Sequence, residues 1–295
     1  MLRRDRDPAA DPKHGRSFPD WAAPAALAFV TGSRALMDVR VPIADQVDWL
    51  LRREPGYLIT LPSNLSLLAR HCVEHAIRLP TLRLVRTVSE VLTDDLRALC
   101  QRAFGVPIAD LYSTEEVGPI ALQCPLHTHY HVQSEALLVE ILDEQGAPCG
   151  PGQAGRVVVT PLHNLAMPLL RYVIGDYAEV GPPCDCGRTL PVLTRILGRD
   201  RNRLVMPNGE RTYAAVSPRI GEVAAIIQHQ MVQTRIDQIE LRIVVRRQLT
   251  DDETGFLRDV IQHNLGHPFP IDIVYVDAIP RTESGKFEDF RCEVP

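Results

Sequence analysis

Short apolar runs alternate with segments of helical spacing over residues 21–120. The apolar runs predict buried strands, and they cover residues 57–61, 82–88 and 106–111. The segments between them carry apolar residues at three- and four-residue intervals, which predicts helices over residues 43–51, 65–75 and 93–104. Strands that alternate with helices indicate a partial parallel α/β sheet.

The pattern changes after residue 120. Residues 131–142 alternate between apolar and polar positions and predict one strand, and residues 155–160 predict a second. Short strands separated by glycine- and proline-containing turns are typical of a β-barrel or sandwich. We therefore expect a β-rich subdomain over residues 121–199.

The last hundred residues predict a compact α+β unit. Helices are expected over residues 216–230 and 251–264, and strands over residues 238–245 and 271–276. We place the boundary of this small C-terminal domain, residues 200–295, at Asp200. At the other end, residues 1–20 are charged and contain proline, and we expect them to be poorly ordered.

Composition narrows the class of protein. The 295 residues are 45% hydrophobic and 23% charged with a net charge of −5, which is ordinary for a globular protein and gives no sign of nucleic-acid binding. No apolar run reaches membrane-spanning length, and the first residues lack a signal-peptide core. We expect a cytoplasmic protein without nucleic-acid or membrane partners.

Hydroxyl and carboxylate side chains follow the third predicted strand. Tyr112, Ser113 and Thr114 precede Glu115 and Glu116. Polar groups at a strand end suit a ligand site of an open α/β sheet. The alternative is a capped turn, with Ser113 or Thr114 as N-cap of a helix whose first turn contains Glu116.

Two further segments suit phosphate chemistry. In residues 171–176, Asp176 is suited to accept hydrogen bonds from a ribose diol, and Arg171 to neutralise phosphate; the alternative is a surface turn with an Arg–Asp pair. In residues 279–287, a predicted turn presents Lys286. The chain contains only one other lysine, Lys13. Such an ammonium bridges a carboxylate and a phosphate, whereas the alternative is a solvated loop.

Three cysteines and a histidine predict a zinc site. One residue separates Cys184 from Cys186, and a glycine follows Cys186. Cys124 precedes His127, His129 and His131. Three thiolates and one imidazole form a closed tetrahedral zinc site of structural type. The spacing leaves the choice among the three histidines open, and unlinked thiols are the alternative.

Together and in this order, these segments resemble the adenylate-forming ligases, specifically their phenylacetate–CoA ligase branch. The resemblance implies that Tyr112, with Ser113 and Thr114 in the same motif, binds adenine, that Glu116 binds magnesium, and that Asp176 holds the ribose. It implies that Ser89 and Glu90 line the adenine and acyl pocket. It also implies that Lys286 is the adenylation lysine, and it favours His131 as the zinc ligand.

The resemblance also implies an architecture: an incomplete ligase large domain, with a partial parallel α/β sheet and a β-barrel-like subdomain, and a small mobile α+β C-terminal domain. Gly198, Arg199 and Asp200 resemble the hinge on which that domain turns. The family's Ser/Thr/Gly-rich phosphate loop has no counterpart here, because residues 31–33 are too short for it. We expect a truncated enzyme.

The resemblance implies ATP-dependent conversion of a carboxylic acid, aromatic in part of the branch, to acyl-AMP, followed by transfer to CoA or an amine. ATP or AMP, magnesium, structural zinc and CoA are the implied cofactors. The alternative is a non-catalytic ligand-binding or interaction module built on the same scaffold. A homodimer is left open as its assembly.

Overall fold

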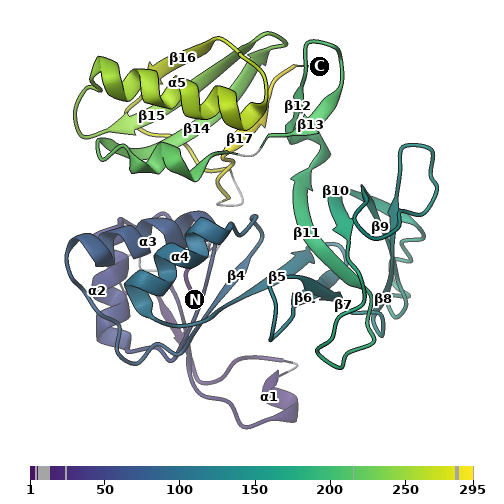
Figure 1. Cartoon of the computed structure of the whole chain (residues 1–295). Coiled ribbons are helices and arrows are strands. Elements are labelled where there is room, and N and C mark those ends of the chain that lie inside the picture. The colour runs from purple at the N-terminus through teal and green to yellow at the C-terminus, as the bar shows by residue number, and fades with distance from the viewer. Residues whose placement is uncertain (4, 6–13, 24, 215, 283–285, 295) are drawn as a thin grey trace.

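The computed structural model describes residues 1–294 except residues 4, 6–13, 24, 215 and 283–285. Two bodies are visible in Figure 1, a larger one formed by the first two thirds of the chain and a smaller one formed by the C-terminal third. Among the described residues, we find no helix with the length and apolarity required to cross a membrane.

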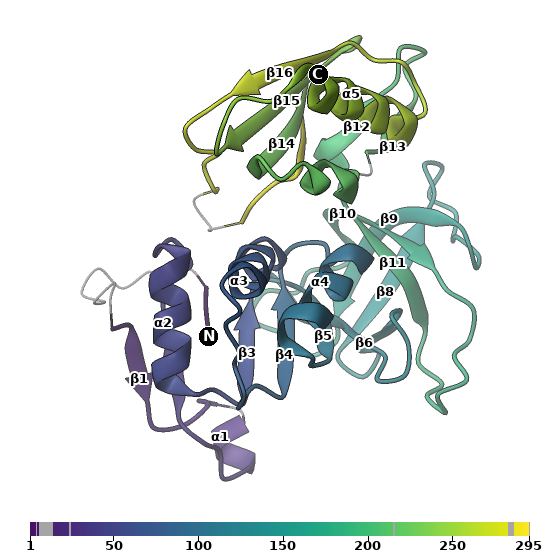
Figure 2. The ribbon, with the colours of Figure 1, turned by 60° about the vertical axis from the view of Figure 1, so that its left-hand side comes forward.

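A three-stranded parallel segment begins the main sheet. It consists of β3 (Tyr57–Thr60), β4 (Leu84–Val88) and β5 (Ile108–Thr114), paired in that order. The connecting helices are α2 (Ile43–Arg53), α3 (Pro62–Glu74) and α4 (Asp94–Phe104), and Figure 2 shows α3 and α4 in front of the strands. The predicted α/β alternation is confirmed.

Local chemistry sets the bounds of α4. The Thr93 hydroxyl accepts a hydrogen bond from the Leu96 amide at the start of the helix, and Gly105 with φ of 66° ends it. Between these caps, Leu96, Cys100 and Ala103 are buried in the core that α2 and α3 also line. Capping and apolar spacing therefore act together here.

Part of the N-terminal segment packs against the larger body, and its expected poor order stays a prediction. Leu2 is fully buried, and its amide donates to the Ile59 carbonyl of β3 at 2.8 Å. Strand β1 (Arg16–Phe18) pairs with β2 (Arg34–Leu36), and the short helix α1 (Ala25–Ala28) follows β1 in the chain. The prediction for residues 4 and 6–13 lies outside the described residues.

The β-rich part continues the same sheet. Its strands are β6 (Gly118–Gln123), β7 (Tyr130–Val132), β8 (Leu137–Leu142), β9 (Ala154–Pro161), β10 (Tyr172–Val180) and β11 (Val192–Arg199). The order of the nine-stranded sheet is β3-β4-β5-β6-β7-β11-β10-β9-β8. Antiparallel strands surround a separate core, so the expected barrel-like part is an extension of the α/β sheet.

The single strand predicted over residues 131–142 is wrong. The chain turns after Val132, because the Ala136 and Leu137 amides both donate to the Gln133 carbonyl at 2.9 and 3.1 Å. This turn separates β7 from β8 and moves β8 to the far edge of the sheet. Alternation continues across the turn, which explains why the pattern did not reveal it.

The C-terminal body contains a four-stranded sheet. It comprises β14 (Ile226–Arg235), β15 (Gln238–Val245), β16 (Ile271–Tyr275) and β17 (Phe290–Cys292), in the order β16-β15-β14-β17. Helix α5 (Asp251–Leu265) begins with a capping box between Thr250 and Glu253 and packs on this sheet. A hairpin of β12 (Arg203–Val205) and β13 (Arg211–Tyr213) leads into it after the short helix η1 (Asp200–Asn202).

The helix predicted over residues 216–230 is wrong. Only a short 3₁₀ helix, η2 (Pro218–Glu222), forms there, and β14 begins at Ile226. Pro218 disfavours a helical conformation of the residue before it. Val232 and Met231 are buried in the centre of the sheet, between β15 and β17, so tertiary packing decides the conformation.

Candidate functional site

Asp176 is the centre of a cluster that three strands build. Arg199 on β11 lies directly opposite Asp176 on β10, and its Nε is 2.9 Å from Asp176 Oδ1. From β5, the Tyr112 hydroxyl donates to Asp176 Oδ2 at 2.9 Å. Gly175 precedes Asp176 with φ of 79°, a conformation that favours glycine and coincides with an interruption in the β9–β10 pairing.

The electrostatics of Asp176 bring two more residues into the cluster. Burial raises the pKa of Asp176, and the charge of Glu116 raises it further. Arg199, the Tyr112 hydroxyl and Lys286 oppose this rise in pKa. The charge of Lys286 in the C-terminal body therefore acts on Asp176, as does the charge of Glu116 in the turn after β5.

Glu116 lies in a β-hairpin. Strand β5 runs through Ser113 to Thr114, and β6 begins at Gly118, with Thr114 paired to Gly118. The Thr114 hydroxyl accepts from the Val117 amide at 3.4 Å. The alternative of a capped helix start is therefore wrong for this segment, because the chain reverses into β6 instead.

The backbone at Lys286 is held by Thr282. The Thr282 amide donates to the Lys286 carbonyl at 2.9 Å, and the Lys286 amide donates to the Thr282 hydroxyl at 3.1 Å. Lys286 is half-buried. The lysine that the sequence singled out is thus bonded through its backbone to Thr282, and it directly precedes Phe287, whose amide donates to Glu90 of the larger body.

Three predicted site residues lie elsewhere or face other partners. Arg171 is paired with Glu140 at 3.0 Å, with 62% of its side chain exposed, so its ion pair is not with Asp176. Ser89 is exposed and has φ of 72°. Glu90 is bonded to Ser63 and to the Phe287 amide. Ser63 was missed, and its place at the start of α3 was the only sequence signal for it.

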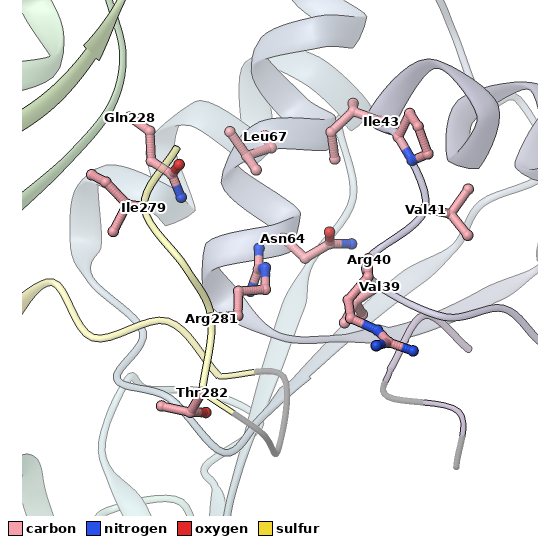
Figure 3. A pocket seen from close by; sticks show the side chains of 11 residues that line it. Val39, Arg40, Val41, Ile43, Asn64, Leu67, Gln228, Ile279, Arg281 and Thr282 are labelled. Carbon is pink, nitrogen blue, oxygen red and sulfur yellow. The ribbon is translucent and has the colours of Figure 1, made fainter. Parts of the chain in front are cut away.

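A cavity of about 830 Å³ is lined by residues of both bodies. Figure 3 shows Arg281 of the C-terminal body next to Asn64 of α3, with Thr282 farther along the same C-terminal segment. The remaining walls combine apolar side chains with amide and guanidinium groups: Val39, Arg40, Val41, Pro42, Ile43, Leu67, Gln228 and Ile279. Its position next to Thr282 places it beside the turn of Lys286.

The predicted metal ligands converge from three segments. Cys124 follows β6 and His131 lies on β7, while Cys184 and Cys186 lie between β10 and β11. The Sγ atoms of Cys124 and Cys184 are 3.9 Å apart, and Cys186 Sγ is 3.3 Å from His131 Nε2. These distances suit a shared tetrahedral ion with thiolate and imidazole ligands.

The histidines differ in their surroundings. Cys124, His129, His131 and Cys184 each offer a ligand atom within 4.8 Å of the others. His127 Nε2 is instead 2.6 Å from Asp185 Oδ1. The buried His131 Nδ1 has no hydrogen-bond partner among the described residues. The geometry therefore supports His131 and His129 more than His127.

The chain is similar in sequence to several known proteins. The family model described as CapK C-terminal domain matches residues 204–290. A phenylacetate–coenzyme A ligase of Thermus thermophilus is 26% identical over 86% of this chain and 65% of its own length. Protein CapK of Staphylococcus aureus is 26% identical over 67% of this chain and 44% of its own length.

Solved structures show the same fold. A 2-hydroxyisobutyryl-CoA ligase, in complex with its acyl-AMP in the postadenylation state, has a TM-score of 0.69 at 22% identity, covering 86% of this chain and 57% of that one. An anthranilate CoA ligase in complex with anthranoyl-AMP has a TM-score of 0.65 at 17% identity, with coverage of 87% and 53%.

The mixed sheet with its appended α+β body is the fold of these acid–CoA ligases over the part that this chain covers. In sequence the chain is similar to phenylacetate–CoA ligases, and it shares the fold of acid–CoA ligases over the part that it covers. It spans 44% to 65% of the length of the curated relatives that it matches.

Proposed function

We propose that this chain carries the nucleotide-binding and lysine-bearing part of an acyl-adenylate-forming ligase of the acid–CoA type. The observation that carries the proposal is the contact of Tyr112 and Arg199 with Asp176 from two other strands. The charges of Glu116 and of Lys286, the latter from the C-terminal body, also act on this carboxylate. A ribose-binding carboxylate beside a mobile ammonium suits transfer of an adenylyl group.

In the first step, a carboxylate oxygen of the acid attacks the α-phosphorus of ATP, and the bond to the pyrophosphate oxygen breaks. Asp176 accepts hydrogen bonds from the ribose hydroxyls while Arg199 and Tyr112 fix its orientation. The Lys286 ammonium neutralises negative charge on the carboxylate and the α-phosphate. Positioning and charge neutralisation supply the rate enhancement.

In the second step, the acyl carbonyl carbon of acyl-AMP is attacked by a thiol such as that of CoA, or by an amine. The thioester or amide bond forms, AMP leaves with the former carboxylate oxygen, and the acceptor loses its proton. The apolar and guanidinium walls of the 830 Å³ cavity are consistent with a small organic acid in its neighbourhood.

Two metals belong to the proposal. Glu116 offers a carboxylate for magnesium, which supplies charge neutralisation of the phosphates when bound. Cys124, Cys184, Cys186 and His131 would hold a structural zinc, because the donor set is of the closed type, the Sγ atoms of Cys124 and Cys184 are 3.9 Å apart, and Cys186 Sγ is 3.3 Å from His131 Nε2.

Three measurements on the chain test the proposal: binding of a non-hydrolysable acyl-adenylate analogue, ATP–pyrophosphate exchange with a panel of carboxylic acids, and acyl transfer to CoA from supplied acyl-AMP. The variants are Asp176→Ala, Lys286→Ala and Lys286→Arg. Arg195→Ala is the matched control, because Arg195 lies on the same strand as Arg199 but forms its ion pair with Glu179.

We expect Asp176→Ala to weaken analogue binding and Arg195→Ala to leave it unchanged. Where exchange occurs, Lys286→Ala should lower it by several hundred-fold, since loss of a transition-state charge contact costs about 3–4 kcal/mol. Lys286→Arg should not restore the exchange rate, because the planar guanidinium group does not replace a compact ammonium group. Analogue binding without exchange or transfer would favour the non-catalytic module, and no binding would refute both.

A further inference from the structure

Glu90 connects the two bodies of the molecule. Its Oε1 accepts hydrogen bonds from the Phe287 amide at 2.7 Å and from the Ser63 hydroxyl at 3.0 Å. Its Oε2 accepts from the Ser63 amide at 2.8 Å. The three donors come from the start of α3 and from the residue that directly follows Lys286, so the carboxylate joins both bodies at the lysine turn.

Arg281 completes the connection on the other side of the turn. Its Nη1 donates to the Ser63 hydroxyl at 2.8 Å and lies 4.0 Å from Glu90 Oε1. The side chains of Arg281 and Glu90 are only 13% and 9% exposed. Ser63 and Glu90 therefore bind the chain both before and after Lys286, at Arg281 and at Phe287.

Other contacts between the bodies are of a different kind. Glu74 and Arg246 form a pair at 2.8 Å, but their side chains are 47% and 56% exposed. Arg70 donates to the Gly221 carbonyl at 3.4 Å. Exposed ion pairs contribute little to stability, whereas hydrogen bonds to a buried charge are among the strong ones. The contacts of Glu90 are the ones able to fix an orientation.

Burial of Glu90 has an energetic cost. Desolvation raises the pKa of Glu90, while the Phe287 amide, the Ser63 amide and hydroxyl, and the Arg281 charge oppose the rise. A buried carboxylate is tolerated only when its partners are in place. If the C-terminal body turned away, the Phe287 amide and Arg281 would leave, and water would have to replace them.

We propose that Glu90 is a positioning residue that locks the turn of Lys286 against the larger body for the adenylation step. The inference rests on the proposed function and deepens it. Glu90 acts through the Phe287 amide and Ser63, so it fixes the backbone next to Lys286 and leaves the ammonium available to Asp176. It thus has a role other than the pocket-lining role that the resemblance implied.

The direct test measures how accessible Lys286 is. The chain contains only two lysines, so acylation by an amine-reactive ester, followed by mass spectrometry of peptides, reports on Lys286 with Lys13 as internal reference. The variants are Glu90→Gln, Glu90→Ala and Ser63→Ala. Glu74→Gln is the matched control, because it removes a carboxylate at the exposed contact between the same bodies.

We expect Lys286 to be labelled about tenfold faster in Glu90→Ala, and several-fold faster in Glu90→Gln and Ser63→Ala, as loss of a hydrogen bond to a charged group typically permits. Glu74→Gln should label like the wild type. Unchanged labelling of Lys286 in Glu90→Ala and Ser63→Ala, both with wild-type circular dichroism and melting, would overturn the proposal.

Kinetics separate the inference from the proposed function. In Glu90→Gln, kcat of pyrophosphate exchange should fall about tenfold with little change in KM for ATP, whereas acyl transfer from supplied acyl-AMP should not fall. A parallel fall of both half-reactions would overturn the positioning role. Faster labelling in a protein without any exchange would refute the proposed function and leave the docking role of Glu90 standing.

Discussion

The hydroxyl of Tyr112 donates a hydrogen bond to Asp176 across 64 residues of sequence, at 2.9 Å. Tyr112 is 8% exposed and packs in the core of the β-rich part. Burial raises the pKa of this phenol and the negative charge of Asp176 raises it further, so the hydroxyl remains a donor. The bond therefore holds one orientation of the carboxylate that we propose binds ribose.

Replacement of Tyr112 by phenylalanine separates the ring from the hydroxyl. The ring that we propose binds adenine is kept, but Asp176 loses a donor, which we expect to weaken binding of an acyl-adenylate analogue about 5- to 10-fold, as for a typical single hydrogen bond. Isothermal titration calorimetry measures this. Tyr172→Phe, on β10, is the control, and an unchanged affinity in Tyr112→Phe would show that the hydroxyl has no part in binding.

Replacement of Asp176 by asparagine should stabilise the fold while it weakens nucleotide binding. Because the folded chain raises the pKa of Asp176, the folded state holds this proton more tightly than the unfolded state does. Wild-type stability therefore falls as pH rises from the ordinary aspartate value through the raised one. At neutral pH we expect the variant to gain roughly 0.5–2 kcal/mol in free energy of unfolding.

Urea unfolding at several pH values checks the sign. The gain should be complete above the raised pKa of Asp176 and should vanish below about pH 3.9, where aspartate is protonated in both states. The asparagine side chain of the variant does not titrate, which makes the difference specific to this group. A variant that is less stable than the wild type at neutral pH would contradict the analysis.

The zinc prediction concerns Cys184. Serine does not replace a thiolate ligand at neutral pH, so Cys184→Ser should lower the bound zinc from about one per chain to below about a tenth and lower the melting temperature. Elemental analysis by mass spectrometry after dialysis measures the zinc. Cys149→Ser is the matched control, because the Cys149 thiol donates to the Ala154 carbonyl and is not among the predicted zinc ligands.

The zinc content of the histidine variants then identifies the fourth zinc ligand. His131→Ala should lose the metal because His131 Nε2 faces Cys186 Sγ at 3.3 Å, while His127→Ala should keep it because His127 pairs with Asp185. Loss of zinc in His129→Ala but not in His131→Ala would assign the place to His129. Equal zinc content in the wild type and Cys184→Ser would show that the cluster does not bind zinc.

Much of the fold followed from local pattern. The strand–helix alternation before residue 112 and the unit of β15, α5 and β16 were predicted with nearly correct bounds, because apolar spacing and caps agree there. Residues 216–230 failed because their buried positions are set by neighbours in the sheet, and the sequence contains no local sign of those neighbours.

The candidate site shows the same division. Tyr112, Asp176 and Lys286 were predicted through motif order, and the structure joins Tyr112 to Asp176 by a hydrogen bond, while the roles of the three residues stay predictions. The contacts of Glu90 with Ser63 and Phe287 were missed, since they join segments 27 and 197 residues apart. Contacts between residues so far apart in the chain depend on how the two bodies dock. The local sequence pattern contains no information about that docking.

Arg203 forms a clamp at the junction of the two bodies. Its guanidinium lies over the Tyr177 ring at 4.8 Å and is 2.8 Å from Asp200 and 3.5 Å from Glu144. The Tyr177 hydroxyl in turn donates to Glu144 at 2.9 Å. Since Arg203 begins β12 and Tyr177 lies on β10, this clamp restrains the turn at which we propose that the C-terminal domain rotates.

Arg203→Ala should therefore loosen the junction and speed proteolytic cleavage within residues 200–209 about 5- to 20-fold, as loss of a desolvated cation–π contact and an ion pair typically permits. Thermolysin is the suitable protease, because trypsin would lose its own cleavage site in the variant. Arg235→Ala, which removes an exposed pair with Asp237 within the C-terminal body, should be cleaved at the wild-type rate. If Arg203→Ala is cleaved no faster than Arg235→Ala, or if cuts fall only outside residues 200–209, the rotation point is not at Asp200.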